Sequence, residues 1–147
     1  MFARFTLTAG LVALFAVAPA FAQDITIVDA YARSASPMAK TGAAFLIIEN
    51  HTDHDDRLIG VASPAAKMVQ LHTHVDNGQG VMSMVHVKEG FALPEGGAIT
   101  MQRGGEHVMF MGLTGPFEQG ATIPLTLTFE KAGEMEIEVP VDLERKP

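Results

Sequence analysis

The chain has 147 residues, no cysteine, no tryptophan and a formal net charge of −7 at pH 7. An acidic surface disfavours nucleic acids and anionic membranes as partners. The absence of cysteine excludes disulfides, thiolate metal sites and cysteine nucleophiles. Any soft-metal site must therefore use the chain's nine methionines and six histidines. The length and the lack of internal repeats fit one domain.

The first 22 residues have the pattern of a cleaved secretory signal. Arg4 gives a basic start, a short apolar run follows, and residues 20–22 form a small-x-small cleavage site before Gln23. The apolar run is too short to span a bilayer comfortably. We therefore expect residues 1–22 to be removed and residues 23–147 to form an exported domain without membrane insertion.

The remaining residues form a succession of short runs rich in β-branched and apolar side chains, separated by Gly, Pro, Asn and Asp. No comparable stretch has helical periodicity. About nine short antiparallel strands at this spacing predict an all-β fold, a two-sheet sandwich. The runs are 25–33, 43–50, 57–63, 67–74, 81–87, 98–102, 107–113, 122–130 and 134–141.

Side-chain alternation assigns faces within these runs. In residues 122–130 the apolar side chains point to one face and the threonines to the other. A hairpin through residues 131–133 is expected to join that strand to 134–141. In residues 25–33 the same rule places Ile25, Ile27 and Asp29 on one face, which indicates an edge or mixed strand.

Residues 67–113 hold most of the candidate metal ligands. Alternation groups histidine and methionine on one side of two separate strands. Thioethers suit Cu(I) and imidazoles suit several transition metals, so a mixed set without carboxylates favours copper over zinc, calcium or magnesium. A single methionine is more often a core residue, and only the repeated coincidence with histidine indicates a metal site. The two groups are Met82, Met84 and His86, and His107, Met109 and Met111.

The segment LHTHVDNGQGVMSMVHV, followed by GGEHVMFMGL, resembles the signature of periplasmic Cu(I)-binding chaperones of the PCu(A)C family. That signature is a histidine, a methionine after about ten residues, and His-x-Met after about twenty-one more. The matching positions are His72, Met84, His107 and Met109, with eleven and twenty-two intervening residues. Each gap is one residue longer than the pattern, in turn-like segments 76–80 and 88–97 that tolerate insertion. Met82 in place of Met84 and His74 in place of His72 stay open as alternatives.

The resemblance extends to DAYAR, to AKTGAAFLIIEN and to the PLTLTFE ending, and so covers nearly all of the mature chain. It implies a Greek-key, cupredoxin-like sandwich that binds Cu(I) in the periplasm. It also implies delivery of copper towards the CuA centre of cytochrome c oxidase, with the CuA subunit or a Sco-type protein as acceptor. A second Cu(II) ion at the additional histidines is left open.

The sequence shows no recognisable catalytic arrangement, so we expect a metal carrier and not an enzyme. A blue-copper electron carrier would need the cysteine that this chain lacks. The alternatives are an exported binding module with no physiological metal and a copper storage or resistance protein.

Overall fold

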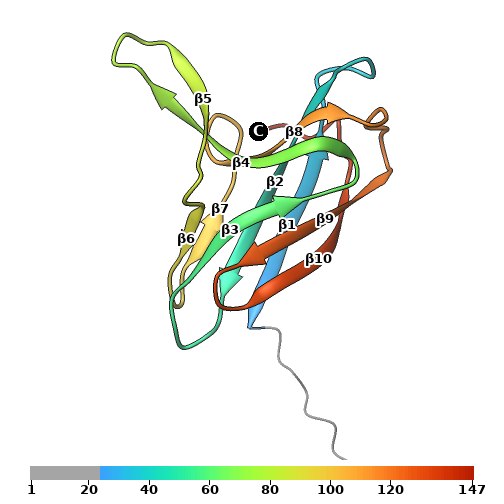
Figure 1. Ribbon diagram of the computed structural model, residues 1–147. Helices are drawn as coiled ribbons and strands as arrows, with labels where there is room; N and C mark the ends of the chain where they lie inside the picture. The colour runs from blue at the N-terminus through green and yellow to red at the C-terminus, as the bar shows by residue number, and fades with distance from the viewer. Residues whose placement is uncertain (1–23) are drawn as a thin grey trace, which may run out of the picture.

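Ten strands separated by Gly-, Pro- and Asp-containing turns make up the computed structural model, which describes residues 24–147 (Figure 1). The expected signal segment, residues 1–22, lies outside the described residues. No helix among residues 24–147 is long and apolar enough to cross a membrane. The strands are β1 (Ile25–Arg33), β2 (Thr41–Asn50), β3 (Asp56–Ala62), β4 (Ala66–Asp76), β5 (Met82–His86), β6 (Phe91–Leu93), β7 (Ala98–Thr100), β8 (His107–Leu113), β9 (Thr122–Phe129) and β10 (Gly133–Pro140).

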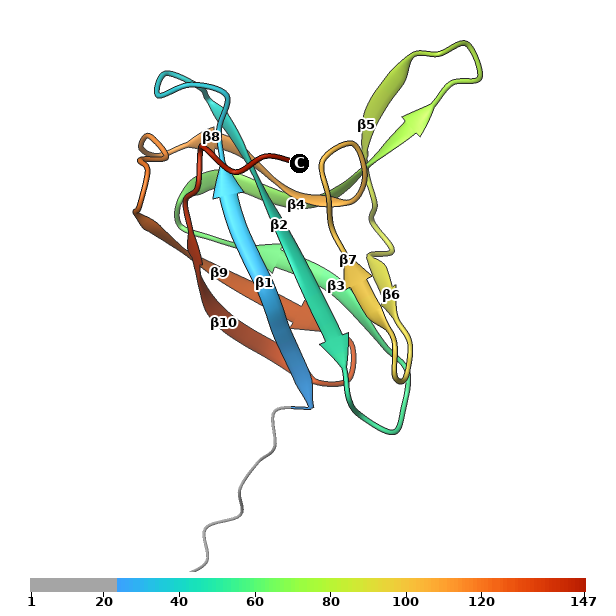
Figure 2. The same cartoon turned by 180° about the vertical axis from the view of Figure 1, so that it is seen from behind.

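The strands form two antiparallel sheets, so the prediction of an all-β sandwich is confirmed. One sheet has the order β1-β2-β8-β4-β5, with β7 also paired to β2, and the other has the order β10-β9-β3-β6. Figure 2 shows the first sheet from the side of β1 and β2. Each of the nine predicted runs overlaps one strand, with bounds that differ by at most two residues. The one strand without a predicted run is β6, which lies in a segment that the sequence predicts to be a turn. Its three residues are too few to show an alternating pattern.

The core lies between the two sheets and is built from alternate residues of their strands. The apolar positions of β9 all face inward, as alternation predicts, and β10 pairs with β9 through a hairpin at residues 130–132. Burying these side chains is the main favourable term in folding a domain of this kind. The fully buried residues include Leu46, Ile48, Leu58, Leu93, Val108, Phe110, Leu125, Leu127 and Val139.

The face assignment for β1 is wrong at Asp29. The register against β2 shifts between Ile27 and Asp29, so one extra residue breaks the alternation there. Ile25 and Ile27 keep to the core side, whereas Asp29 lies opposite Ile47 on the outer face. There Asp29 accepts hydrogen bonds from both terminal nitrogens of Arg145.

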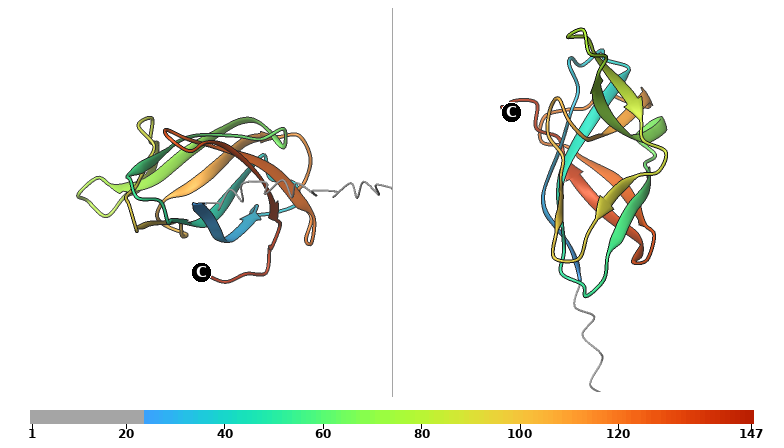
Figure 3. Two further views of the ribbon diagram at one scale, coloured as in Figure 1. Left: turned by 90° about the horizontal axis from the view of Figure 1, so that it is seen from below. Right: turned by 90° about the vertical axis from the view of Figure 1, so that its left-hand side faces the viewer.

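The β4–β5 hairpin extends beyond the body of the sandwich, and the right-hand view of Figure 3 shows it at the top of the molecule. The first part of β4, Ala66 to His72, pairs with β8, and its last part, from His72 to Asp76, pairs with β5. Every residue of β5 is exposed. The hairpin therefore presents side chains beside β8 without burying them in the core.

Candidate metal centre

Strands β8, β4 and β5 lie side by side, and their registers bring the predicted ligands together. His72 of β4 lies opposite His107 on one side and His86 on the other, and His74 lies opposite Met84. The intervening residues of β4 and β8, such as Leu71 and Val108, face the core. The histidine and methionine positions of all three strands therefore share the outer face of the sheet.

The two histidines of β4 form close cross-strand pairs with β5. The Val87 amide donates to the Leu71 carbonyl, and the Asn77 amide donates to the Val81 carbonyl. These bonds flank residues 72, 74 and 76, which makes their pairs with β5 the non-hydrogen-bonded kind, in which side chains approach most closely. The imidazole ring centroids of His72 and His86 are 5.9 Å apart.

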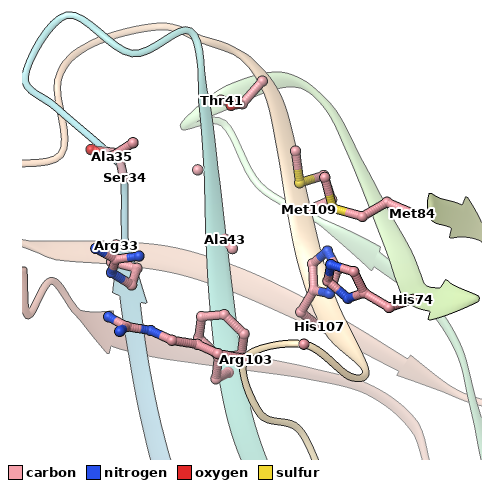
Figure 4. Close-up of a pocket in the computed structure, with 13 residues that line it drawn as sticks. Arg33, Ser34, Ala35, Thr41, Ala43, His74, Met84, Arg103, His107 and Met109 are labelled. Carbon is pink, nitrogen blue, oxygen red and sulfur yellow. The ribbon is translucent and has the colours of Figure 1, made fainter. Parts of the chain in front are cut away.

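A cavity of about 300 Å³ opens on this face (Figure 4). Its lining includes Met84, His107 and Met109, three of the four predicted ligands, together with His74. Figure 4 shows these two thioethers and two imidazoles turned towards one another. His72 is not in the lining. It lies beside the cavity on β4, opposite His107, and its ring centroid is 5.9 Å from that of His107.

One backbone carbonyl orients both imidazoles of the cavity. The Nδ1–H of His107 donates to the Gly105 oxygen at 2.9 Å, and the Nδ1–H of His74 donates to the same oxygen at 3.2 Å. A carbonyl can only accept, so both rings carry their proton on Nδ1 when neutral. The Nε2 lone pair of each ring is then left to bind a metal ion, as is common for metal-ligating histidines.

His107 is kept in its neutral form by burial. Its exposed fraction is 3%, although it lies on the outer face of the sheet. The Phe45 ring centroid is 6.1 Å from its own. Burial is the largest cause that lowers the pKa of His107 below 6.5; the nearby His74 lowers it further, and the Gly105 carbonyl opposes the shift. Near neutral pH the ring is therefore available as a ligand.

His72 has an unsatisfied nitrogen. Its Nε2 lies 3.0 Å from the Gln70 side-chain oxygen, to which it donates, and its Nδ1 is buried without a hydrogen-bond partner. Burial lowers the pKa of His72, followed by the proximity of His107 and His86. A buried acceptor without a partner is costly, and a bound ion is one way of satisfying it.

The structure also adds residues that sequence reasoning missed. Arg33 of β1 and Arg103 of the β7–β8 loop line the same cavity, and Gly105 orients the imidazoles. No local pattern could have found them, because they come from parts of the chain whose pairing the sequence does not reveal. Within residues 24–147 no three His, Cys, Asp or Glu side chains are grouped to hold a metal ion.

The antiparallel sandwich is the fold of solved PCuAC domains, in agreement with the resemblance seen in the sequence. The chain belongs to the LpqE-like family, whose model, described as "Putative lipoprotein LpqE-like", matches residues 25–141. A relative from Leifsonia xyli subsp. xyli, "Putative lipoprotein Lxx21020", is 36% identical over 99 residues. That alignment covers 67% of this chain and 59% of the relative.

Solved structures of PCuAC domains share the fold. The copper-bound PCuAC domain from PmoF2 is 28% identical with a TM-score of 0.66, and the match covers 82% of this chain and 93% of that one. The Cu(I) form of DR1885 from Deinococcus radiodurans is 29% identical with a TM-score of 0.64, covering 86% of this chain and 85% of that one. The apo PCuAC domain from PmoF1 is 25% identical with a TM-score of 0.67, covering 82% and 94%.

Proposed function

We propose that this protein is an exported Cu(I) carrier that binds one ion through His72, Met84, His107 and Met109. The observation that carries the proposal is the convergence of two thioethers and two imidazoles in one cavity on the outer face of the sheet. Met84, His107 and Met109 already face one another, and His72 on β4 lies directly opposite His107 on β8. The copper-bound relatives of the same fold support the choice of metal.

The donor set favours Cu(I) over the other common ions. Thioether sulfur is a soft donor, whereas Cu(II) prefers nitrogen and oxygen in a tetragonal arrangement. Magnesium and calcium need oxygen ligands, and the cavity lining contains no carboxylate. Zinc is usually held by cysteine, histidine or carboxylate and rarely by thioethers.

The proposed role is to hold copper outside the cytoplasm and pass it to an acceptor. The secretory pattern of residues 1–22 and the lipoprotein descriptions of the family both support export. Delivery towards a CuA centre, with a Sco-type protein or the CuA subunit as the acceptor, follows from the family resemblance. The open position of the cavity beside an exposed hairpin suits transfer by exchange of ligands one at a time.

Copper titration of methionine variants tests the proposal. We expect Met84→Leu and Met109→Leu each to weaken Cu(I) binding at least about tenfold, because Leu keeps nearly the same volume but has no donor atom. Met135→Leu is the matched control, since Met135 lies on β10 in the other sheet and should not affect binding. Wild-type Cu(I) affinity in both cavity variants would refute the ligand assignment.

A further inference from the structure

Two arginines form the wall of the cavity opposite the histidines and methionines. Arg33 ends β1, and Arg103 lies in the loop between β7 and β8. Figure 4 shows both guanidinium groups on one side of the cavity and the sulfur and imidazole groups on the other. Neither arginine is one of the proposed copper ligands.

Neither arginine has a carboxylate partner among residues 24–147. The Nε atoms of Arg33 and Arg103 are both buried without a hydrogen-bond partner. One terminal N–H of Arg103 donates a hydrogen bond to the Arg145 carbonyl oxygen at 2.9 Å. Asp29, an acidic residue of the same outer face, is already paired with Arg145. Both arginines therefore line the cavity, and each has one buried donor, Nε, that remains unsatisfied.

The cavity is positively charged on an otherwise acidic protein. Its 13 lining residues include Arg33 and Arg103 but no Asp or Glu, although the whole chain has a formal net charge of −7. A Cu(I) ion held by neutral imidazole and thioether ligands would add another positive charge. Like charges that share one partly buried site repel one another, and a bound anion would reduce that repulsion.

We propose that the cavity binds a carboxylate group, which Arg33 and Arg103 hold beside the copper ligands. The planar fork of a guanidinium matches the two oxygens of a carboxylate, and such charge-assisted bonds are among the strongest in proteins. A volume of about 300 Å³ has room for acetate or for the end of an Asp or Glu side chain. The arginines alone carry this site, whereas its coupling to the metal rests on the proposed function.

The coupling has a definite sign. A carboxylate in the cavity favours Cu(I) at the neighbouring ligands, and Cu(I) favours the carboxylate by the same factor, because binding linkage is reciprocal. A donor or acceptor protein that inserts an acidic side chain would therefore be recognised better by the loaded form than by the metal-free form. A free organic acid presents the same carboxylate group, and the experiment has to separate these two sources.

The test follows the Nε–H signals of arginine side chains by NMR while sodium acetate is added to the metal-free protein at constant ionic strength. We expect saturable shifts at Arg33 and Arg103 and none at Arg57, which bonds to the Glu89 and Gly90 carbonyls away from the cavity. Arg103→Gln should weaken acetate binding at least about tenfold, and Arg57→Gln should leave it unchanged. Non-saturating shifts, or equal shifts at Arg57, would overturn the proposal.

Two further measurements complete the test. A capped aspartate peptide that binds more tightly than acetate would identify a protein side chain as the source, and equal affinity would identify a free acid. Inorganic phosphate binding in preference to both would overturn the assignment to carboxylates. Because acetate is titrated without metal, a failure here leaves the Cu(I) proposal standing, and a failure of the methionine variants leaves the carboxylate site standing.

Discussion

At the scale of single residues, the Gly105 carbonyl determines what the cavity can bind. By accepting from Nδ1 of both His74 and His107, it leaves two Nε2 lone pairs free in rings that face Met84 and Met109. His72 differs, because its Nε2 is occupied by Gln70 and its Nδ1 is unsatisfied. The structure thus offers two imidazoles of β4 as neighbours of His107, and only one is needed to complete a four-ligand set.

We expect His72→Gln to weaken Cu(I) binding at least about tenfold and His74→Gln to have a smaller effect. A metal ion would satisfy the buried Nδ1 of His72, whereas neither ring nitrogen of His74 is a buried atom without a partner. Competition titrations of Cu(I) against a chromophoric chelator would measure both variants, with His51→Gln as a control from an exposed loop. The reverse order of effects would make His74 the fourth ligand.

The buried histidines also predict how stability depends on pH. Burial lowers the pKa of His107 and of His72 below 6.5. As the pH falls through 6.5, these two histidines therefore become protonated in the unfolded chain before they do in the folded chain. The free energy of unfolding of the metal-free protein should therefore fall as pH drops below 6.5, by up to about 1.4 kcal/mol per pH unit for each such proton.

Urea unfolding of metal-free wild type and His107→Gln between pH 7.5 and 5.5 would measure this dependence. Burial raises the pKa of Glu106 and so acts in the opposite direction, but it does so in both proteins. The difference between the two curves reports His107 together with its effect on the pKa of His72, and we expect the variant to lose stability less steeply. Parallel curves would show that His107 takes up protons in the folded protein as readily as in the unfolded chain.

At the scale of strands, the sequence predicts most elements because alternation and turn residues are local signals. Runs such as 122–130 and 107–113 correspond to β9 and β8 with little or no change in their bounds. Two features are not local. The bulge in β1 depends on its pairing with β2, and β6 exists because Phe91 and Leu93 find buried positions beside β3.

The turn that leads into β6 depends on Gly90. It has a φ of 75°, and a Cβ atom there would lie 2.0 Å from the Leu58 carbonyl oxygen. We expect Gly90→Ala to lower the free energy of unfolding by more than about 2 kcal/mol, since backbone strain adds to a clash with rigid main chain. Gly96→Ala is the control, because Gly96 also has a positive φ but no atom within 4 Å. If the urea midpoints shifted equally in both variants, backbone strain alone would explain the loss of stability and the clash with Leu58 would contribute nothing.

At the scale of the whole molecule, the candidate site arises from strand order. The sequence predicts which residues of each strand share a face, but it does not predict that β8 lies between β2 and β4. That order places His107 across from His72 and brings Arg33, at the end of β1, to the opposite wall. The pairing depends on contacts between residues far apart in the chain, which no local pattern encodes. The histidine and methionine types that line the cavity could therefore be predicted from sequence, whereas the shape and charge of the cavity could not.

The absence of cysteine predicts the direction in which copper moves. Thiolates are stronger donors to Cu(I) than thioethers and imidazoles, so a Cys-containing acceptor should take copper from this protein. Mixing the Cu(I)-loaded protein with such an acceptor, separating the two and measuring their copper should show forward transfer, and the loaded acceptor should return little. The open cavity provides the route, because an incoming thiolate can displace one ligand at a time beside the exposed β5. If this protein instead stripped Cu(I) from the acceptor, or bound Zn(II) as tightly as Cu(I), a storage or structural metal site would replace the carrier, since a carrier has to release its ion to a site with stronger donors.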